Sequence, residues 1–189
     1  MLTQSLVFIL ETFVGLFVFA LLMRFYLQWF RAAPRNPVSQ FLHALTDWIV
    51  LPARRFIPGL WGIDLASFVM AWAFEFLLMV LIAYLHGVPI SLLTAGSWLG
   101  LALLAVVRLI KLTIYLLIFA VIVQAVLSWV NPYNPATPIL NSVTNPFLRP
   151  FRRRIPSVGG VDLSPLFVIV MCQLLLMVPI AWLERALAI

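Results

Sequence analysis

The chain has 189 residues, of which 65% are hydrophobic and 10% are charged. A soluble domain is about 45–50% apolar and about 25% charged, so this composition excludes a soluble globular protein and predicts one that lies in a lipid bilayer. The net charge of +6 comes from basic residues that flank apolar segments. This placement indicates membrane orientation or anionic lipid headgroups, and we expect no nucleic-acid partner. The single cysteine, Cys172, excludes an intrachain disulfide and a thiolate metal cluster, and we expect no metal or cofactor.

The first apolar segment, Ser5–Phe30, predicts an uncleaved transmembrane helix, because neither a basic region nor a small-residue cleavage site marks it as a signal peptide. Such a helix would be ~39 Å long against a hydrocarbon core of ~30 Å, so we expect it to tilt or protrude. Tyr26 and Trp29 near its end are typical of an interfacial aromatic belt.

The loop after this span predicts a short amphipathic helix. Asn36 is a good N-cap, Pro37 suits the first helical position, and Pro52 is expected to end the helix. Apolar residues fall on one stripe of this helix, namely Val38, Phe41, Leu42, Leu45, Trp48 and Ile49. The helix is too short to span a bilayer and too one-sided for water, so we expect it to lie in the membrane interface.

The second predicted span, Leu65–Leu85, is expected to begin at a cap formed by Asp64 and carries Glu75 as its only charge. The apolar stretch after it, residues 88–104, could be interfacial, re-entrant or spanning. A third full span there would invert everything after it, so we favour a short interfacial or re-entrant helix that runs into the next span. The expected units are then residues 1–87, this connector, and residues 105–189.

The second half of the chain repeats this order. A span over Ala105–Val130 leads into a loop where Asn134 and Pro135 are expected to begin a second amphipathic helix. The last span, Leu163–Leu183, is expected to follow a cap formed by Asp162.

A fixed offset of 98 positions relates the two loops and marks a duplicated unit. Each loop carries arginines, whereas no basic residue occurs between the second span and Arg108. Positively charged loops stay in the cytoplasm, so both loops are expected to face inward and both termini outward. Loops on one side need an even number of spans between them, which predicts four transmembrane helices in two parallel repeats.

The repeated motif resembles the YggT family of bacterial and plastid membrane proteins. It runs from Trp29 to Leu65 and from Trp129 to Leu163 and contains Trp29, Asn36, Pro37, Pro52, Pro58, Asp64, Trp129, Asn134, Pro135, Pro150, Pro156 and Asp162. The resemblance implies a multi-pass protein of the bacterial inner membrane. It also implies links to osmotic tolerance, to cell division and nucleoid distribution, and to plastid cytochrome assembly. The family supplies no catalytic residues to carry over.

The arginines of the loops allow two interpretations. They could bind anionic lipid headgroups or an acidic partner, each contributing ~1 kcal/mol near an anionic surface, or they could only fix the topology. Their constant place between two prolines favours a shaped binding segment. The residues concerned are Arg54, Arg55, Arg149, Arg152, Arg153 and Arg154.

Polar residues inside the predicted spans suggest contacts between helices, because an unpaired charge there costs at least ~2.5 kcal/mol. We expect an ion pair between Arg24 and Glu75, replaced in the second repeat by a hydrogen bond between Gln124 and Gln173. A contact between Glu11 and Lys111, with Arg108 nearby, is a further expectation, with independent contact with water as its alternative. An ion-conducting or proton-relay role for these residues is the rival to a structural one.

No nucleophile, phosphate loop or carboxylate pair suggests an enzyme. The sequence predicts a non-enzymatic scaffold or assembly factor, for cell division, the envelope or a membrane complex, that recruits lipid or a membrane or cytoplasmic protein through its basic loops. The alternative is a component of ion or osmolyte movement, or of osmotic-stress tolerance. A homo-oligomer is compatible with both.

Overall fold

The computed structural model describes residues 1–32, 36–59, 62–89, 93–131, 134, 136–155 and 162–187, apart from the side chain of Trp129. Within these ranges the protein is helical and contains no strand. Four segments are long and apolar enough to cross a membrane. They are α1 (Leu2–Trp29), α3 (Leu65–Leu85), α4 (Ala95–Val130), and the continuous run of α6 (Ser164–Leu175), the π-helical turn η2 (Leu176–Ile180) and α7 (Ala181–Leu187). The predicted all-α membrane fold with four spans is confirmed.

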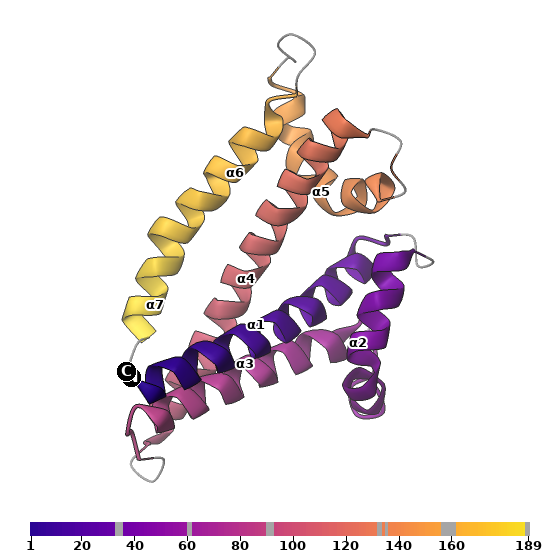
Figure 1. Cartoon of the computed structure of the whole chain (residues 1–189). Helices are drawn as coiled ribbons and strands as arrows, with labels where there is room; N and C mark the ends of the chain where they lie inside the picture. Colours follow the sequence, from indigo (N-terminus) through magenta and orange to yellow (C-terminus); the bar gives the residue numbers. More distant parts are fainter. Residues whose placement is uncertain are drawn as a thin grey trace.

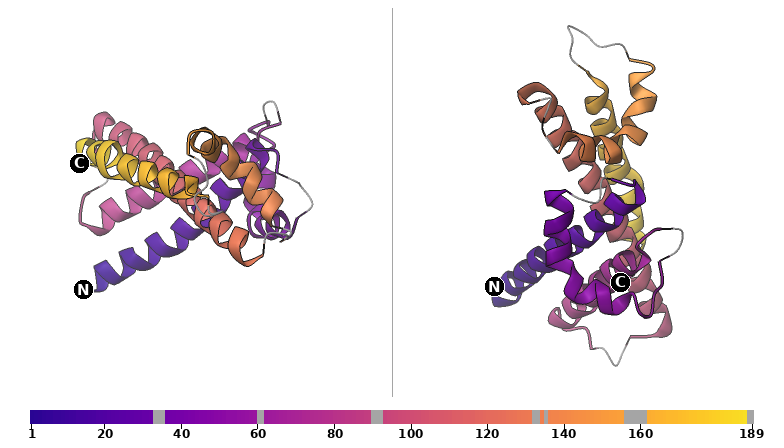
Figure 2. Two further views of the ribbon diagram at one scale, coloured as in Figure 1. Left: turned by 90° about the horizontal axis from the view of Figure 1, so that it is seen from above. Right: turned by 90° about the vertical axis from the view of Figure 1, so that its right-hand side faces the viewer.

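The two shorter helices, α2 (Pro37–Ala53) and α5 (Thr137–Arg152), each lie between the two spans of one repeat. Both sit at the end of the molecule opposite to the chain termini, whereas the connection between α3 and α4 lies at the terminal end (Figure 1). The views from above and from the side show the same arrangement (Figure 2). The two repeats therefore run in the same direction, and their loops share one end of the fold.

The start of α2 follows the predicted capping. Asn36 is extended and its Oδ1 accepts a hydrogen bond from the Ser39 N–H at 2.7 Å, while Pro37 occupies the first helical position. The second loop differs from the prediction, because α5 begins at Thr137 with Ala136 as its N-cap. Asn134 instead accepts from the Ala136 N–H at 2.8 Å, a local turn that precedes the helix. Pro135 lies outside the described residues.

The apolar stripe predicted for α2 divides between two environments. Leu42 is buried, whereas Phe41 and Trp48 are 65% and 64% exposed. The face of α2 that packs against the protein contains the polar residues Ser39 and Thr46, because both find hydrogen-bond partners there. In α5 the buried face likewise combines Thr144 with apolar residues, namely Ile139, Val143 and Leu148.

The span predicted for Ala105–Val130 is part of a longer helix. α4 has 36 residues and begins at Ala95, where the Thr94 hydroxyl accepts from the Ser97 N–H. Its length of ~54 Å exceeds a hydrocarbon core of ~30 Å. Most of the expected connector over 88–104 is therefore the first part of α4 and forms no separate helix, while its position in the membrane stays a prediction.

The last span also extends beyond its predicted end, to Leu187. Pro179 lies inside η2, where the Ala181 N–H bonds to the Leu176 carbonyl five residues back. The wider turn accommodates a residue that has no N–H to give to an α-helical hydrogen bond. It sets the rotation of α7, and with it the direction of Glu184.

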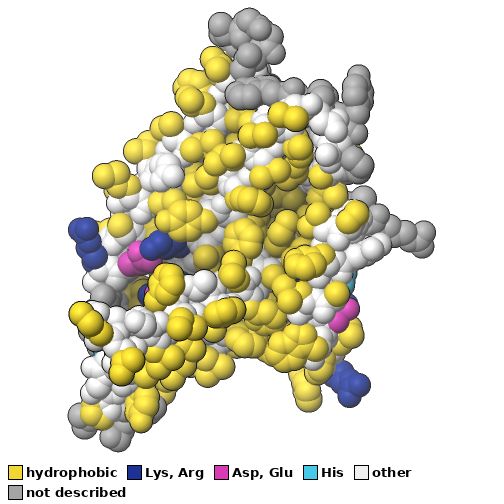
Figure 3. All heavy atoms as spheres, in the orientation of Figure 1, with side chains coloured by type: hydrophobic (Ala, Val, Ile, Leu, Met, Phe, Trp, Pro, Cys, Tyr) yellow, Lys and Arg dark blue, Asp and Glu magenta, His cyan; other side chains and the backbone are white. Residues whose placement is uncertain are grey.

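The core consists of three connected groups of buried side chains. The first group is centred on Val18, Leu21, Leu22 and Ala71 of the first repeat and also contains Leu109 and Leu116 of α4, while the second is centred on Val121, Leu148 and Cys172. A third group joins the repeats and contains Ala20, Leu27, Leu42, Ile139 and Val143. Much of the remaining surface is hydrophobic (Figure 3), as expected for helices whose outer faces meet lipid.

Candidate functional site

A cluster of polar side chains ties the loop of the first repeat to its two spans. It consists of Arg24 on α1, Thr46 and Asp47 on α2, Arg54 after α2, and Asp64 before α3, and we call it the first loop cluster. Arg24 is 4% exposed, which is unusual for a charged residue in an apolar helix. Its Nη1 donates to the Thr46 hydroxyl at 2.7 Å and to Asp47 at 2.6 Å, and its Nε lies 3.2 Å from Asp64.

Asp64 is the acceptor at the centre of this cluster. The side chain of Arg54 grips it with two nitrogen atoms, Nη2 at 2.6 Å and Nε at 3.2 Å, and the Ser67 hydroxyl donates at 2.7 Å. Asp64 occupies the predicted N-cap position of α3, but its carboxylate caps no backbone N–H. Its main role is therefore to bind cations, and the expectation of a simple helix cap is wrong.

The charges of the first loop cluster stabilise one another. Burial acts to raise the pKa of Asp64, but hydrogen bonds from Arg54 and Ser67 and the charges of Arg54 and Arg24 outweigh it, so this pKa is lowered. The pKa of Asp47 is also lowered, because bonds and charges from Arg24 and His43 outweigh its burial. The bond to Asp64 raises the pKa of Arg54. All these groups are charged at neutral pH.

The second repeat has a counterpart, the second loop cluster, made of Gln124, Asn141, Thr144, Asn145, Arg152 and Asp162. The Thr144 hydroxyl donates to the Gln124 carbonyl oxygen, and the Gln124 amide donates to Asn141. Separately, Arg152 donates to Asp162 at 2.7 Å and to Asn145 at 3.0 Å. Asp162 also accepts from the Ser164 N–H at the start of α6, but the N-cap position is occupied by Leu163, so the prediction of Asp162 as the cap residue is wrong by one position.

In both repeats an arginine at the end of the loop helix pairs with the aspartate before the next span, Arg54 with Asp64 and Arg152 with Asp162. We call this ion pair the clasp. The two clusters differ in charge at two other positions. Where the first has the ion pair of Arg24 and Asp47, the second has the neutral pair of positions Gln124 and Asn145. Both members of an ionic pair are therefore replaced by amides, but Gln124 bonds to Asn141 and Thr144 while Asn145 bonds to Arg152.

The predicted pairing of Arg24 with Glu75 is wrong, because Arg24 lies in the first loop cluster and Glu75 contacts Arg108 instead. The predicted hydrogen bond between Gln124 and Gln173 is also wrong, since Gln173 is exposed on α6. Both errors have one cause: the prediction paired charges along the two spans and ignored the polar face of the loop helix between them.

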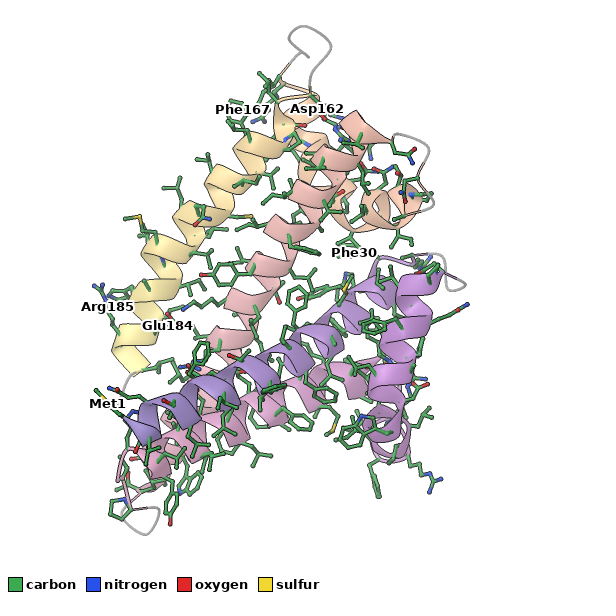
Figure 4. All side chains as sticks on the ribbon, viewed as in Figure 1. Met1, Phe30, Asp162, Phe167, Glu184 and Arg185 are labelled. Carbon is green, nitrogen blue, oxygen red and sulfur yellow. The ribbon has the colours of Figure 1, made fainter. Side chains whose placement is uncertain are left out.

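A separate group of charges lies near the other end of the spans, and we call it the terminal cluster. Arg108 on α4 lies 3.6 Å from Glu11 and 3.5 Å from the buried Glu75, while Lys111 contacts both oxygens of Glu184 at 2.9 Å. Glu184 faces α4 whereas Arg185 points away from it (Figure 4). Glu11 therefore pairs with Arg108 and not with Lys111, the partner that the sequence predicted. Lys111 pairs instead with Glu184, because α7 extends far enough to bring this carboxylate to it.

The terminal cluster lines a cavity of about 270 Å³. Acidic and basic side chains gather beside α7 between surfaces that are otherwise hydrophobic (Figure 3). Three carboxylates and two cations give these five residues a net charge of −1. A neighbouring cavity of about 280 Å³ reaches from His86 to Arg108, and its other lining residues are apolar.

The remaining arginines of the loops have no such partners. The side chains of Arg55, Arg149, Arg153 and Arg154 are exposed and make no ion pair or hydrogen bond within the part of the chain that is described. The predicted binding segment therefore divides in each repeat: Arg54 and Arg152 hold the fold together, and the others remain available. Binding of lipid or a partner by any of these arginines stays a prediction.

The other motif residues serve the backbone or the surface. Pro52 and Pro150 lie in the last turns of α2 and α5, Pro58 is exposed, and Trp29 is 50% exposed at the end of α1. The Trp129 side chain and Pro156 are outside the described residues. Among the described residues, no group of three His, Cys, Asp or Glu side chains is placed to hold a metal ion.

Sequence reasoning missed Thr46, Asp47, Asn141, Thr144 and Asn145 as members of the clusters. A signal for them exists, because Thr46 and Thr144 are identical residues at the repeat offset of 98, and Asp47 and Asn145 occupy the next equivalent positions. Both threonines are 0% exposed, which a hydroxyl tolerates only with a partner.

The four spans and the charged clusters between them define a multi-pass helical membrane protein built from two tandem repeats. The sequence profile of the CCB3/YggT family matches residues 3–85 and 103–183, so the chain belongs to this family. The predicted membership and the duplication are confirmed.

Relatives of this chain carry no assigned activity. An uncharacterised protein of Pseudomonas aeruginosa is 38% identical over 92% of this chain and 87% of its own length. The YggT protein of Escherichia coli K12 is 34% identical over 89% of this chain and 85% of its own length. The ycf19 protein of Porphyra purpurea is 37% identical over 34% of this chain and 70% of its own length. No solved structure is significantly similar to the chain.

Proposed function

We propose that this protein is a non-enzymatic scaffold of the bacterial inner membrane, with both loops in the cytoplasm and both termini outside. Its loops recruit anionic lipid and an acidic membrane or cytoplasmic protein during the assembly of a larger complex, such as one for cell division or the envelope. The observation that carries this proposal is the division of the arginines in both repeats. One arginine of each segment is clasped by an aspartate, and its neighbours are left exposed at the same end of the fold.

The clasps support recruitment because they remove flexibility from the segment that would bind. Asp64 is 1% exposed, so Arg54 anchors the end of α2 to a fixed point at the start of α3. Arg55 follows directly and is held near this anchor, which lowers the entropy that it loses when it binds a phosphate or carboxylate. The same reasoning applies to Arg153 beside Arg152.

The outer face of α2 supports placement at a membrane surface. Phe41, Trp48 and Phe56 are large, exposed and on the loop side of the first repeat, where aromatic rings meet the headgroup region favourably. Exposed arginines beside such a face would meet anionic headgroups and the acidic surface of a partner together.

The test is crosslinking in native membranes with identification of the captured protein and of retained lipid. The variant replaces Arg55, Arg149, Arg153 and Arg154 with Gln, and the matched control is Arg185→Gln, an exposed arginine at the opposite end. We expect the loop variant to lose the captured partner and anionic lipid while the control keeps both. Equal capture by the two variants would contradict recruitment by the loops.

The alternative, movement of an ion or osmolyte, draws support from the terminal cluster and its two cavities. These cavities bring polar groups from the terminal end to Glu75. The first loop cluster is separated from them by the apolar core around Val18, Leu21 and Ala71. Flux of potassium or sodium into proteoliposomes, abolished by Glu75→Gln, would favour this alternative over the scaffold.

A further inference from the structure

A cavity of about 370 Å³ lies between the loop-side end of α1 and the first turns of α2. We propose that it binds a phosphate-type oxyanion, either free phosphate or the headgroup of an anionic phospholipid. Its polar lining comes from Arg24, Gln28, Arg31, Ser39 and His43, and none of its lining residues is acidic. Arg55, Arg149, Arg153 and Arg154 do not line it, so the site is independent of the scaffold function proposed above.

Arg24 supplies the first reason. Its guanidinium is 3% exposed and forms part of the cavity wall. Nε and Nη1 are bonded to Asp64, Thr46 and Asp47, but Nη2 is buried and has no hydrogen-bond partner among the described residues. A buried cationic donor without a partner costs free energy, and an anion in this cavity would accept its hydrogen bond.

Arg31 supplies the second reason. α1 ends in a Schellman motif, with hydrogen bonds from Ala32 to Leu27 and from Arg31 to Gln28. This places Arg31 in the left-handed region at φ 51°, where glycine is the usual residue. The turn that ends α3 is of the same kind and does use glycine, Gly87, at φ 85°. The first repeat thus keeps a cation at the rim of the cavity in a conformation that disfavours any side chain.

The surroundings are also suited to an anion. Ser39 lines the cavity from the first turn of α2, a helix of 17 residues whose N-terminal end carries a partial positive charge. Arg24, Arg31 and Arg54 carry three positive charges against two on Asp47 and Asp64, which leaves +1 before His43 is counted. A bound anion would neutralise this excess.

The second repeat serves as an internal comparison. The first spans align at an offset of 100, which matches Trp29 with Trp129, and the loop helices align at 98. The positions equivalent to Arg24, Arg31 and His43 are then Gln124, Asn131 and Asn141, so all three basic side chains of the cavity are replaced by amides. If the cavity only reflected how the helices pack, the two repeats would not need to differ in charge at all three of these positions. We therefore infer one anion site for the molecule, located in the first repeat.

The experiment uses the full chain in neutral phosphatidylcholine nanodiscs. Inorganic phosphate is titrated by calorimetry, and retention of phosphatidylglycerol against phosphatidylcholine is measured by native mass spectrometry. The key variant is Arg31→Gly, which suits the left-handed turn and should leave the unfolding midpoint unchanged or raised. Arg185→Gln, an exposed arginine outside the cavity and at the opposite end of the fold, is the control.

We expect Arg31→Gly to weaken anion binding at least tenfold while Arg185→Gln keeps it. Loss of phosphate binding identifies the free ion as the ligand, and selective loss of phosphatidylglycerol identifies the lipid headgroup. The site is refuted if the wild-type chain retains neither anion, if Arg31→Gly binds as the wild type does, or if both variants weaken binding equally. Binding by Arg31→Gly at the wild-type level would leave the recruitment by Arg55, Arg149, Arg153 and Arg154 intact.

Discussion

Thr46 and Thr144 show at the scale of a single residue how the two repeats solve one problem differently. Both are fully buried, and each donates to a carbonyl one turn earlier, Leu42 or Leu140. Thr46 also accepts from a cation, Arg24, whereas Thr144 shares its one proton between the Leu140 carbonyl and the neutral Gln124. Hydrogen bonds to charged groups contribute about 1.5–3 kcal/mol and neutral ones about 0.5–1.5 kcal/mol, so the first contact is expected to matter more.

Thr46→Val is therefore predicted to lower the free energy of unfolding by ~2 kcal/mol and Thr144→Val by ~1 kcal/mol. Each change keeps the shape of the side chain and removes its hydroxyl. Unfolding in mixed detergent micelles, followed by helicity, measures both variants on the same scale. A larger loss for Thr144→Val would show that the charge of Arg24 is satisfied without Thr46.

The lowered pKa values of Asp47, Asp64 and Asp162 predict how stability depends on pH. A carboxyl group whose pKa is lower in the folded state stabilises the fold above its unfolded pKa of about 3.9, and this stabilisation is lost as the pH falls through the folded value. We expect the unfolding midpoint to be flat between about pH 7 and pH 5 and to fall below about pH 4.

The variant Asp64→Asn tests which aspartate carries this effect. Its midpoint should be lower at neutral pH and should change less on acidification, because the proton-linked contact is already gone. Asp162→Asn should do less, since the Asp162 side chain is 41% exposed and that of Asp64 is 1% exposed. Equal slopes for the wild type and Asp64→Asn would assign the acid sensitivity to other groups.

At the scale of an element, the π turn η2 decides where the last helix points. Pro179→Ala removes the reason for the wide turn, so an ordinary α-helix should form and rotate α7 by about 100°. That rotation would carry Glu184 away from Lys111. A double-mutant cycle with Lys111→Gln and Glu184→Gln should give a coupling of ~1 kcal/mol in the wild type and none in Pro179→Ala. Coupling that survives the substitution would mean that packing, not the proline, holds the turn.

The elements also show which features could be predicted from sequence. The spans and the capped start of α2 follow from runs of apolar residues and from Asn36-Pro37, which are local signals. The first residues of α4, before Ala105, were assigned to the connector because Gly96 and Gly100 weaken the helical pattern there, although tertiary packing overrides such weak preferences. The partners of Arg24 were missed because they depend on how α2 folds back against α1, and no pattern of neighbouring residues predicts this.

At the scale of the whole molecule, both loops lie at one end and both termini at the other (Figure 1). We expect a membrane-impermeant maleimide added to intact cells to label Arg185→Cys and to spare Arg55→Cys and Arg153→Cys, each made in a Cys172→Ala background. Permeabilised cells, where all three positions react, provide the control. Labelling of one loop without the other would show that the repeats are inverted in the membrane.

The difference between the two loop clusters limits how the halves of this protein can be recombined. Arg24 must travel with Asp47 and Asp64, since either charge left alone in this setting costs about 3–5 kcal/mol. A chimaera joined between α3 and α4 keeps each set together and should insert and fold. One joined between a first span and its own loop helix would graft Gln124 onto two carboxylates and should be degraded. The unit that can be transplanted is the whole hairpin of two spans with its loop helix, never a single helix.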